Sequence, residues 1–392
     1  MRIGLFSNAY RPVVSGVVNS LNEIRRGLLK RNHTPFLFAP EARGYRESHA
    51  GVFRFPSLEL DRSVEFPVPI PYSAKLARLV PKMELDLIHS HHPILVGATA
   101  AGFARKLRLP LVYTFHTQIE QYTHYVPFFS HETVRDAARA KVSRYLAKCE
   151  LVICPSPTIR EYIDSYGANT RVVTLPNAID VKKFLRPAPG GLSLRSHLNL
   201  PPETRISLSV GRLASEKGLP FLFDCFKKTS CTEPHHLVVV GSGPQKTELK
   251  TLAHQLGLQE RIHFLGGVPY HEMPNLYQQS DLFVICSTTE VKPLVVMEAL
   301  ASGLPVLAVS ACGTKDTVTH EKDGLLSDLD NSNYTGAWNR LLQNRDFREL
   351  LSRHASQTAQ SYSIEAYIDR LCRLYEEAMT SYQRGALQKE TG

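Results

Sequence analysis

The sequence lacks several features that would place it in familiar classes. Only 7 of its 392 residues are cysteine, an odd number, and no two form a Cys-x-x-Cys pair. Neither a disulfide framework nor a cysteine-based zinc site is therefore predicted. It contains no apolar run of roughly eighteen residues, which excludes a membrane-spanning helix. Met1–Ser7 runs directly into an apolar strand without the cleavage pattern of a signal peptide, so we expect a cytoplasmic protein with reduced thiols.

The composition predicts two globular domains with an uneven charge. A chain of 392 residues exceeds the usual size of one domain, and 43% hydrophobic residues are enough for real cores. Residues 1–185 hold 25 Lys and Arg against 15 Asp and Glu, whereas residues 186–392 hold 21 against 22. The basic first half indicates an anionic partner, either a membrane or a nucleic acid, or carries ordinary charge for solubility.

Short β-rich runs alternate with helical patterns along almost the whole chain, which is typical of doubly wound parallel sheets. The strands predicted in the first half are Ile3–Ser7, Thr34–Ala39, Leu85–His89, Leu111–Phe115, Leu151–Pro155 and Arg171–Leu175. Those predicted in the second half are Ile206–Val210, His236–Val240, Ile262–Leu265, Leu282–Ile285 and Pro305–Val309. We therefore expect an α/β protein with two Rossmann-like, doubly wound parallel-sheet domains that face a cleft.

A linker-like stretch rich in proline and glycine, Arg186–Gly191, separates the two patterns. We therefore place an N-terminal domain at residues 1–185 and a C-terminal domain at 186–363. The remaining segment, 364–392, begins with a helix predicted at Ile364–Tyr382. We expect this helix to pack back toward the N-terminal domain and to end in a frayed polar tail.

Two carboxylates flank the start of one helix in the second half, and this is the most informative feature of the chain. Glu290 follows a buried strand, and Glu298 lies about two turns later on a helix predicted at Leu294–Ala301. Parallel α/β sheets bind ligands at the carboxyl ends of their strands. An ionised carboxylate accepts hydrogen bonds and cannot donate them, so this pair suits the hydroxyls of a sugar and of a ribose.

Other strand ends of the second half carry groups suited to a nucleotide. Arg212 and Lys217 follow the strand Ile206–Val210 and can neutralise a diphosphate. Gly243 lies in a Gly-x-Gly turn and Val268 follows the next strand, where backbone groups can approach a ligand or hold a base. Phosphate can also bind backbone N–H groups at the start of the helix after Glu290, those of Val291, Lys292 and Leu294.

This combination resembles the retaining family-4 glycosyltransferases of GT-B architecture, over nearly the whole chain. In that family the positions of Arg212 and Lys217 bind the donor diphosphate, that of Glu298 binds the nucleotide ribose, and that of Glu290 binds the transferred sugar. The chain departs from many members at Pro293, where they carry glycine. That departure concerns a backbone contact to the donor and leaves the glutamates unaffected.

The resemblance also assigns two residues of the first half. Gly16 opens a helix after the first strand, in the loop that faces the donor phosphate in the family; a tight turn that requires glycine is the alternative explanation. His116, at the end of Leu111–Phe115, matches the active-site histidine, which touches the transferred sugar. We therefore assign His116 and Glu290 as the catalytic residues.

The sequence predicts no metal site. The cluster His89–His92 has no cysteine or carboxylate to complete a ligand set. Asp328 and Asp330 are interpreted as a turn and a helix cap. The resemblance implies that the protein needs no cofactor besides its substrate, a nucleotide-sugar donor for which UDP is the expected nucleotide.

A basic, aromatic-rich segment follows His116 and is our candidate for contact with the acceptor and a membrane. Its aromatic residues are Tyr122, Tyr125 and Phe128. Its cations border an apolar stripe on a helix predicted at Glu132–Lys148, and they are Arg135, Arg139, Lys141, Arg144 and Lys148. Such a helix suits an anionic membrane surface, but it equally suits docking on its own sheet with a solvated basic rim.

The segments His116–Gln118, with Tyr122, and Glu290–Leu294 are similar to those of the 1,2-diacylglycerol 3-alpha-glucosyltransferases within the family. The resemblance therefore implies transfer of a hexose, most simply glucose from UDP-glucose, to a lipid such as diacylglycerol at the cytoplasmic membrane face. Other acceptors remain open: a sulfoquinovosyl or phosphoinositide lipid, a soluble sugar or a sugar phosphate. A nucleotide-sugar epimerase is a further alternative, and a nucleic-acid binder is disfavoured because no recognition helix is evident.

Overall fold

The computed structural model describes residues 1–58, 67–120, 131–186, 190–191 and 193–391, which form two compact units. The first unit contains residues 1–177 together with 364–392, and the second contains residues 178–363. Among the described residues, none of the helices combines the length and apolarity needed to cross a membrane.

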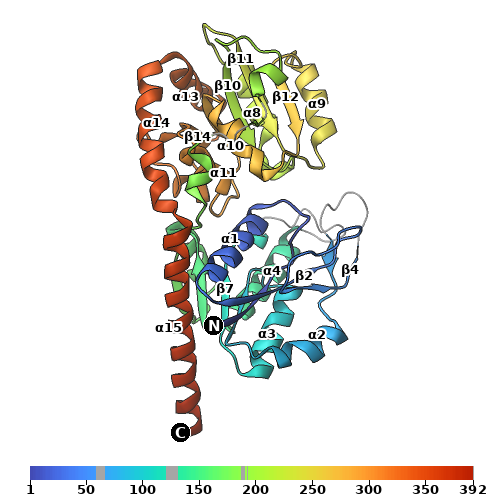
Figure 1. The fold of residues 1–392 in the computed structure, drawn as a ribbon. Helices are drawn as coiled ribbons and strands as arrows, with labels where there is room; N and C mark the ends of the chain where they lie inside the picture. Colours follow the sequence, from blue (N-terminus) through green and yellow to red (C-terminus); the bar gives the residue numbers. More distant parts are fainter. Residues whose placement is uncertain (59–66, 121–130, 187–189, 192, 392) are drawn as a thin grey trace. The chain divides into compact units, whose positions relative to one another are not determined.

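The first unit is built on a parallel sheet with the order β3-β2-β1-β6-β7-β8-β9 (Figure 1). Its strands are β1 (Arg2–Phe6), β2 (Thr34–Pro40), β3 (Val52–Phe55), β6 (Leu87–Ser90), β7 (Leu111–Thr114), β8 (Leu151–Cys154) and β9 (Val172–Thr174), with a small antiparallel ribbon of β4 (Ser57–Leu58) and β5 (Val68–Pro69). Its helices are α1 (Gly16–Lys30), α2 (Ala74–Leu79), the short 3₁₀ helix η1 (Val80–Met83), α3 (Val96–Leu107), α4 (His131–Leu146), α5 (Pro157–Asp164) and α15 (Ile364–Thr391).

The second unit repeats this architecture with a parallel sheet in the order β12-β11-β10-β13-β14-β15. Its strands are β10 (Arg205–Val210), β11 (His235–Val240), β12 (Ile262–Gly266), β13 (Leu282–Ile285), β14 (Val306–Val309) and β15 (Gly324–Ser327). Its α-helices are α6 (Val181–Phe184), α7 (Leu194–His197), α8 (Leu219–Lys227), α9 (Lys246–Gln255), α10 (Met273–Gln278), α11 (Leu294–Ala301), α12 (Cys312–Lys315), α13 (Asn331–Gln343) and α14 (Arg345–Ala359). Its 3₁₀ helices are η3 (Ser215–Lys217), η4 (Tyr270–Glu272) and η5 (Gln360–Tyr362).

Each sheet reverses its strand order once, between β1 and β6 in the first unit and between β10 and β13 in the second. Right-handed crossovers that proceed in opposite directions from such a point place their helices on opposite faces of the sheet. Two separate buried clusters in the second unit agree with this, since one gathers side chains of α10, α11 and α14 and the other those of α8, α9 and α13. The predicted doubly wound parallel sheets are therefore confirmed.

The first domain boundary lies at Asn177 and not at residue 185. Ile179, Val181 and Phe184 are buried in the core of the second unit, so the chain enters that unit before the proline-rich stretch. Sequence analysis placed the boundary by composition, which marks a loop but not the core that the preceding residues join. Residues 187–189 of the predicted linker lie outside the described residues.

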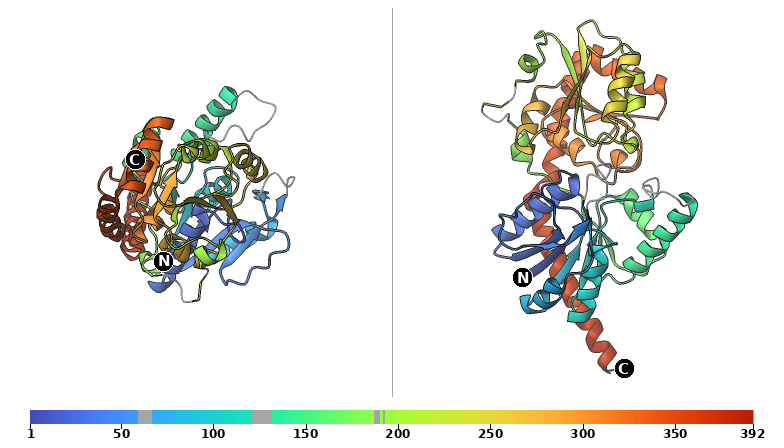
Figure 2. Two further views of the ribbon diagram at one scale, coloured as in Figure 1. Left: turned by 90° about the horizontal axis from the view of Figure 1, so that it is seen from above. Right: turned by 90° about the vertical axis from the view of Figure 1, so that its right-hand side faces the viewer.

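The final helix α15 belongs to the first unit, where it packs beside α1 (Figures 1 and 2). The Arg31 guanidinium donates to the Asp369 carboxylate at 2.5 Å, and Gly27 leaves room for Ile368. The helix continues to Thr391, past the predicted end at Tyr382, and the fraying of its tail stays a prediction. Ala386 to Lys389 are strong helix formers, and they extend the helix past the other elements of the unit.

Candidate functional site

In the second unit, the point where the strand order reverses lies beside several residues singled out from the sequence. In the second unit β10 and β13 are hydrogen-bonded neighbours, and the loops at their carboxyl ends carry Arg212, Lys217 and Glu290. Such a point leaves a crevice at the sheet edge because the following helices cover opposite faces. Residues that directly follow neighbouring parallel strands lie at the same edge of the sheet, and we call this the strand-end rule. It places these side chains at one site, although Arg212 and Glu290 are far apart in sequence.

Lys217 and Glu290 form an ion pair at this point, with 2.5 Å between Lys217 Nζ and Glu290 Oε1. Their side chains are 24% and 18% exposed, so both are largely sheltered yet reachable. Burial acts to raise the pKa of Glu290, but the Lys217 ammonium and hydrogen bonds from Lys217 and Ser287 outweigh it, so the pKa is lowered. Glu290 is therefore an ionised acceptor at neutral pH, with its cation already in place.

Glycines lock the loops after β10 and β11 against each other. A Cβ on Gly243 would lie 2.3 Å from the Leu213 carbonyl oxygen, and one on Gly241, whose φ is +139°, would lie 1.8 Å from that of Gly211. The Leu213 N–H donates to the Ser242 carbonyl at 2.8 Å. The protein's own backbone thus requires these glycines, and the result is a rigid support for the half-buried Arg212.

The side chain of Lys292 anchors the loop before α11 to the core of the second unit. The Lys292 side chain is only 8% exposed, donates to the Asp316 carbonyl oxygen at 2.6 Å and lies over the Tyr362 ring. Burial lowers the pKa of this ammonium to about 8. The Gly313 N–H also donates to the Glu290 carbonyl at 2.9 Å. The side chain of Lys292 is thus directed inward, and the predicted phosphate contact concerns backbone N–H groups, not this ammonium.

Glu298 is buried on α11, with 3% of its surface exposed, and both carboxylate oxygens accept hydrogen bonds. The hydroxyl groups of Tyr270 and Tyr277 donate at 3.0 and 2.9 Å. Burial outweighs these bonds and raises the pKa of Glu298 to about 7. Val268 packs beside the same core as Tyr270, in the loop after β12, so the predicted base and ribose contacts occupy adjoining segments.

Glu298→Gln is expected to stabilise the second unit at about pH 8. The pKa of Glu298 is about 7 in the folded protein, against an ordinary value of 4.5 in an unfolded chain. The stability that this difference contributes is fully present below pH 4.5 and is lost as the pH rises through 7. The free energy of unfolding thereby falls by about 3 kcal/mol. Glutamine removes this cost. Urea unfolding followed by Trp338, the only tryptophan of the chain and buried in this unit, measures the effect.

Tyr277→Phe provides the matched comparison for Glu298→Gln, because it removes one hydrogen bond to the carboxylate but keeps the charge. This variant should be less stable than the parent protein at alkaline pH, whereas Glu298→Gln should be more stable. A Glu298→Gln protein that loses stability at about pH 8 would contradict the burial argument.

In the first unit, the reversal point between β1 and β6 is occupied by Asn8 and His92. The Asn8 N–H donates to His92 Nδ1 at 3.1 Å, and the Asn8 side-chain oxygen accepts from the Val96 N–H at the start of α3. Gly16 is the first residue of α1, and the Ser15 hydroxyl caps that helix by accepting from Val18 N–H. Gly16 therefore lies at an amide-rich helix start, where the predicted phosphate contact remains a proposal.

His116 follows β7 and is half-buried beside His91, with 2.8 Å between His91 Nδ1 and His116 Nε2. Burial lowers the pKa of His116 to about 3 and that of His92 to about 4, and it also lowers the pKa of His91. These imidazoles are therefore neutral at physiological pH. Among the described residues there is no group of three or more side chains able to hold a metal ion.

The candidate acceptor segment divides into a part that is described and one that is not. Tyr122, Tyr125 and Phe128 lie outside the described residues. The apolar stripe docks on its own sheet, where Val142, Tyr145 and Leu146 of α4 and Cys149 after it are buried. The stripe is thus not free for a lipid surface over that length.

The cations of α4, and Lys148 just after it, have different environments. Arg139 lies over the Tyr166 ring and is 3.7 Å from Glu120, so it belongs to the internal structure of the unit. The exposed cations are Arg135, Lys141, Arg144 and Lys148. Of the predicted basic helix, these four side chains are available to an anionic surface.

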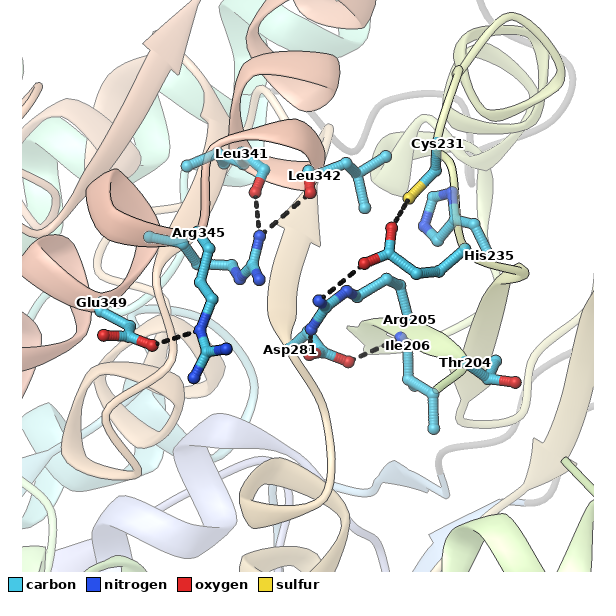
Figure 3. Close-up of polar contacts among 12 residues, drawn as sticks. Thr204, Arg205, Ile206, Cys231, His235, Asp281, Leu341, Leu342, Arg345 and Glu349 are labelled. Carbon is cyan, nitrogen blue, oxygen red and sulfur yellow. Dashed lines mark hydrogen bonds and ion pairs between the residues drawn. The ribbon is translucent and has the colours of Figure 1, made fainter. Parts of the chain in front are cut away.

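The opposite, amino-terminal edge of the second sheet holds a charged cluster of a different kind (Figure 3). Arg205, at the start of β10, donates at 3.0 Å to both the Glu233 and the Asp281 carboxylates. Asp281 also accepts the Ile206 N–H at 2.9 Å. These groups satisfy one another at a strand edge where parallel α/β proteins do not bind ligands, so we interpret the cluster as structural.

Four residues that contact the predicted site residues or lie at the reversal point were not predicted: Asn8, His91, Tyr270 and Tyr277. The strand-end rule could have found the first two, because Asn8 follows β1 closely and His91 follows β6 directly. No comparable signal exists for the tyrosines, which reach Glu298 only through the packing of η4 and α10 on α11. The Asp330 cap was predicted correctly, since its carboxylate accepts from Asn333 N–H at the start of α13.

Family models match both units. The model described as Glycosyltransferase Family 4 matches residues 14–183, and the model described as Glycosyl transferases group 1 matches residues 193–358. Alpha-monoglucosyldiacylglycerol synthase from Streptococcus pneumoniae is 31% identical over 314 residues, which cover 79% of this chain and 71% of the relative. The protein of the same name from Acholeplasma laidlawii is 28% identical over 385 residues, 96% of either chain.

Other similar proteins carry a different activity in their names or have lower sequence identity to this chain. A GDP-mannose-dependent alpha-mannosyltransferase from Corynebacterium glutamicum is 26% identical over 337 residues, 84% of this chain and 77% of the relative. Among solved structures, Anabaena HepE in complex with UDP and glucose superimposes with a TM-score of 0.78 at 22% identity, covering 96% of this chain and all of that one. At this identity the structural likeness shows the fold, and it confirms the predicted GT-B class.

Proposed function

Since the chain belongs to glycosyltransferase family 4 and is thus a hexosyltransferase, we propose that it transfers glucose from UDP-glucose, with retention, to diacylglycerol. The observation that carries this proposal is the Lys217–Glu290 ion pair at the reversal point of the second sheet. It combines a cation for the donor phosphates with an ionised acceptor for sugar hydroxyls.

The second unit supplies the donor contacts in this proposal. Arg212 and Lys217 neutralise the diphosphate, helped by backbone N–H groups at the start of α11. Glu290 accepts hydrogen bonds from hydroxyls of the hexose, and Glu298 accepts those of the ribose. The two tyrosines already bound to Glu298 hold its carboxylate in one orientation before the donor arrives.

The proposed reaction uses the donor's own leaving group as its base. The bond from the anomeric carbon to the diphosphate breaks, and the acceptor oxygen bonds to that carbon on the face that the diphosphate leaves. A diphosphate oxygen takes the acceptor proton, so UDP departs with the proton count balanced. The cations Arg212 and Lys217 stabilise the charge that develops on the diphosphate.

The proposed lipid acceptor has two supports. Both synthases reported above are named for a monoglucosyldiacylglycerol, a glucose-bearing diacylglycerol. In addition, residues 1–185 have 25 basic against 15 acidic side chains, and three cations of α4 and Lys148 after it are exposed. An enzyme that meets its acceptor at an anionic membrane surface benefits from such a charge, and we propose a peripheral, cytoplasmic location on this basis.

The test incubates the purified protein with radiolabelled UDP-glucose, UDP-galactose or GDP-mannose and vesicles of anionic phospholipid containing diacylglycerol. Label from UDP-glucose is expected in the organic phase, as an alpha-linked product, and EDTA should not change the rate. Transfer of label from GDP-mannose to the lipid would instead indicate that the donor is GDP-mannose, as in the name of the mannosyltransferase relative. Label that stays in a water-soluble product, or sugar epimerised without an acceptor, would overturn the lipid assignment.

A further inference from the structure

A buried pair of histidines in the first unit has a hydrogen bond whose direction can be assigned. His91 follows β6 and His116 follows β7, and their rings stack with centroids 5.1 Å apart. His91 Nδ1 and His116 Nε2 are separated by 2.8 Å, so one of these nitrogens carries a hydrogen and donates a hydrogen bond to the other. Two arrangements are possible, and they give His116 opposite chemical properties.

The environment of His91 distinguishes the two arrangements. His91 is 1% exposed, and among the described residues its other nitrogen, Nε2, has no hydrogen-bond partner. If His116 donated, the proton of His91 would lie on Nε2 and leave a buried N–H without an acceptor, which proteins avoid. If His91 donates through Nδ1, the unpaired atom is only a lone pair. The second arrangement is therefore favoured.

Neighbouring residues keep His91 in this position. His89 uses both ring nitrogens, at 2.7 Å from the Tyr375 hydroxyl and at 2.7 Å from Thr114 Oγ1. Its ring centroid is 4.2 Å from that of His91. Because Tyr375 belongs to α15 and Thr114 to β7, the helix and the strand together fix the wall against which His91 packs.

We propose that His91 is a positioning residue that holds His116 as the neutral tautomer with its proton on Nδ1. His116 Nε2 is then occupied as an acceptor, and Nδ1–H is the group left for a substrate. His116 presents a hydrogen-bond donor to a hydroxyl oxygen of the hexose and does not act as a general base. This deepens the proposed function, on which the identity of that substrate rests, and it agrees with a diphosphate oxygen as the proton acceptor.

A spectroscopic test is independent of any substrate. The full chain is labelled with ¹⁵N-histidine, and two-bond ¹H–¹⁵N correlations are recorded at about pH 7.5, where the unperturbed group would also be largely neutral. The His116 signals, identified by their loss in His116→Gln, should show a protonated Nδ1 and an unprotonated Nε2. A protonated Nε2 on His116 would overturn the proposal. The result stands whether or not UDP-glucose proves to be the donor.

A pair of variants tests the consequence for turnover. His91→Asn retains an N–H donor close to the position of Nδ1, whereas His91→Leu keeps the apolar packing but removes the donor. We expect His91→Leu to lower kcat by about 10- to 100-fold with little change in donor KM, and His91→Asn to restore most of the loss. His116 in the leucine variant should also show a mixture of tautomers.

Thermal melting of both variants separates positioning from folding. Equal losses of kcat in His91→Asn and His91→Leu, in proportion to lowered melting temperatures, would mean that His91 only supports the structure and would overturn the proposal. Unchanged kcat in the leucine variant would do the same. Rescue by asparagine at matched stability supports a hydrogen bond from residue 91 to His116, and the tautomer seen in the ¹⁵N spectrum assigns its direction.

Discussion

Glu290→Gln is expected to lower kcat/KM for hexose transfer by about 10²- to 10⁴-fold while the protein stays folded. Glutamine has nearly the same shape and can still accept a hydrogen bond from the Lys217 ammonium. It lacks the negative charge, so it binds sugar hydroxyls more weakly and leaves Lys217 without its counter-ion. Initial rates measured over a range of donor concentrations check the prediction.

The chain offers a matched control for this substitution on the same sheet. Glu233 is also paired with a cation, Arg205, but at the amino-terminal edge. Glu233→Gln removes the same charge from an ion pair away from the site, so its kcat/KM should remain close to that of the parent protein. Near-normal transfer by Glu290→Gln, or an equal loss in both variants, would count against the proposed site.

The first unit is expected to lose stability steeply as the pH falls below about 6.5, because it buries neutral histidines. The pKa is lowered by burial to about 3 for His89 and His116 and to about 4 for His92. Because the pKa of each histidine is lower in the folded protein than in the unfolded chain, its contribution to the free energy of unfolding is fully present above about pH 6.5. That contribution is lost as the pH falls toward the folded-state pKa. At about pH 5 each histidine then costs roughly 2 kcal/mol, and the three together approach the whole stability of a typical domain.

Hydrogen exchange of β6 and β7 between about pH 5 and 8 measures this effect in the first unit, with Trp338 fluorescence reporting on the second. His92→Asn is the informative variant, because the asparagine oxygen can replace Nδ1 as acceptor of the Asn8 N–H. It should reduce the slope of stability against pH by about one proton. Stability of the first unit that is flat down to about pH 5 would contradict the prediction.

Much of the site could be predicted because it follows from local sequence. Each buried apolar run marks a strand, and the residues directly after it lie at the carboxyl edge of a parallel sheet. Lys217 and Glu290 were placed together by this rule alone, and the structure shows them in contact. The rule does not say where a side chain points: the prediction for Lys292 concerned its backbone N–H, and its side chain enters the core toward the Asp316 carbonyl.

The sequence by itself determined the two parallel α/β halves, the strand ends that carry charged groups and the family to which the chain belongs. Only the tertiary structure decided which groups bind one another: Tyr270 and Tyr277 with Glu298, His91 with His116, and α15 with the first unit. The physical reason is that strand formation depends on neighbouring residues. Pairing of buried polar groups depends instead on segments that are distant in sequence and meet only when the core is packed.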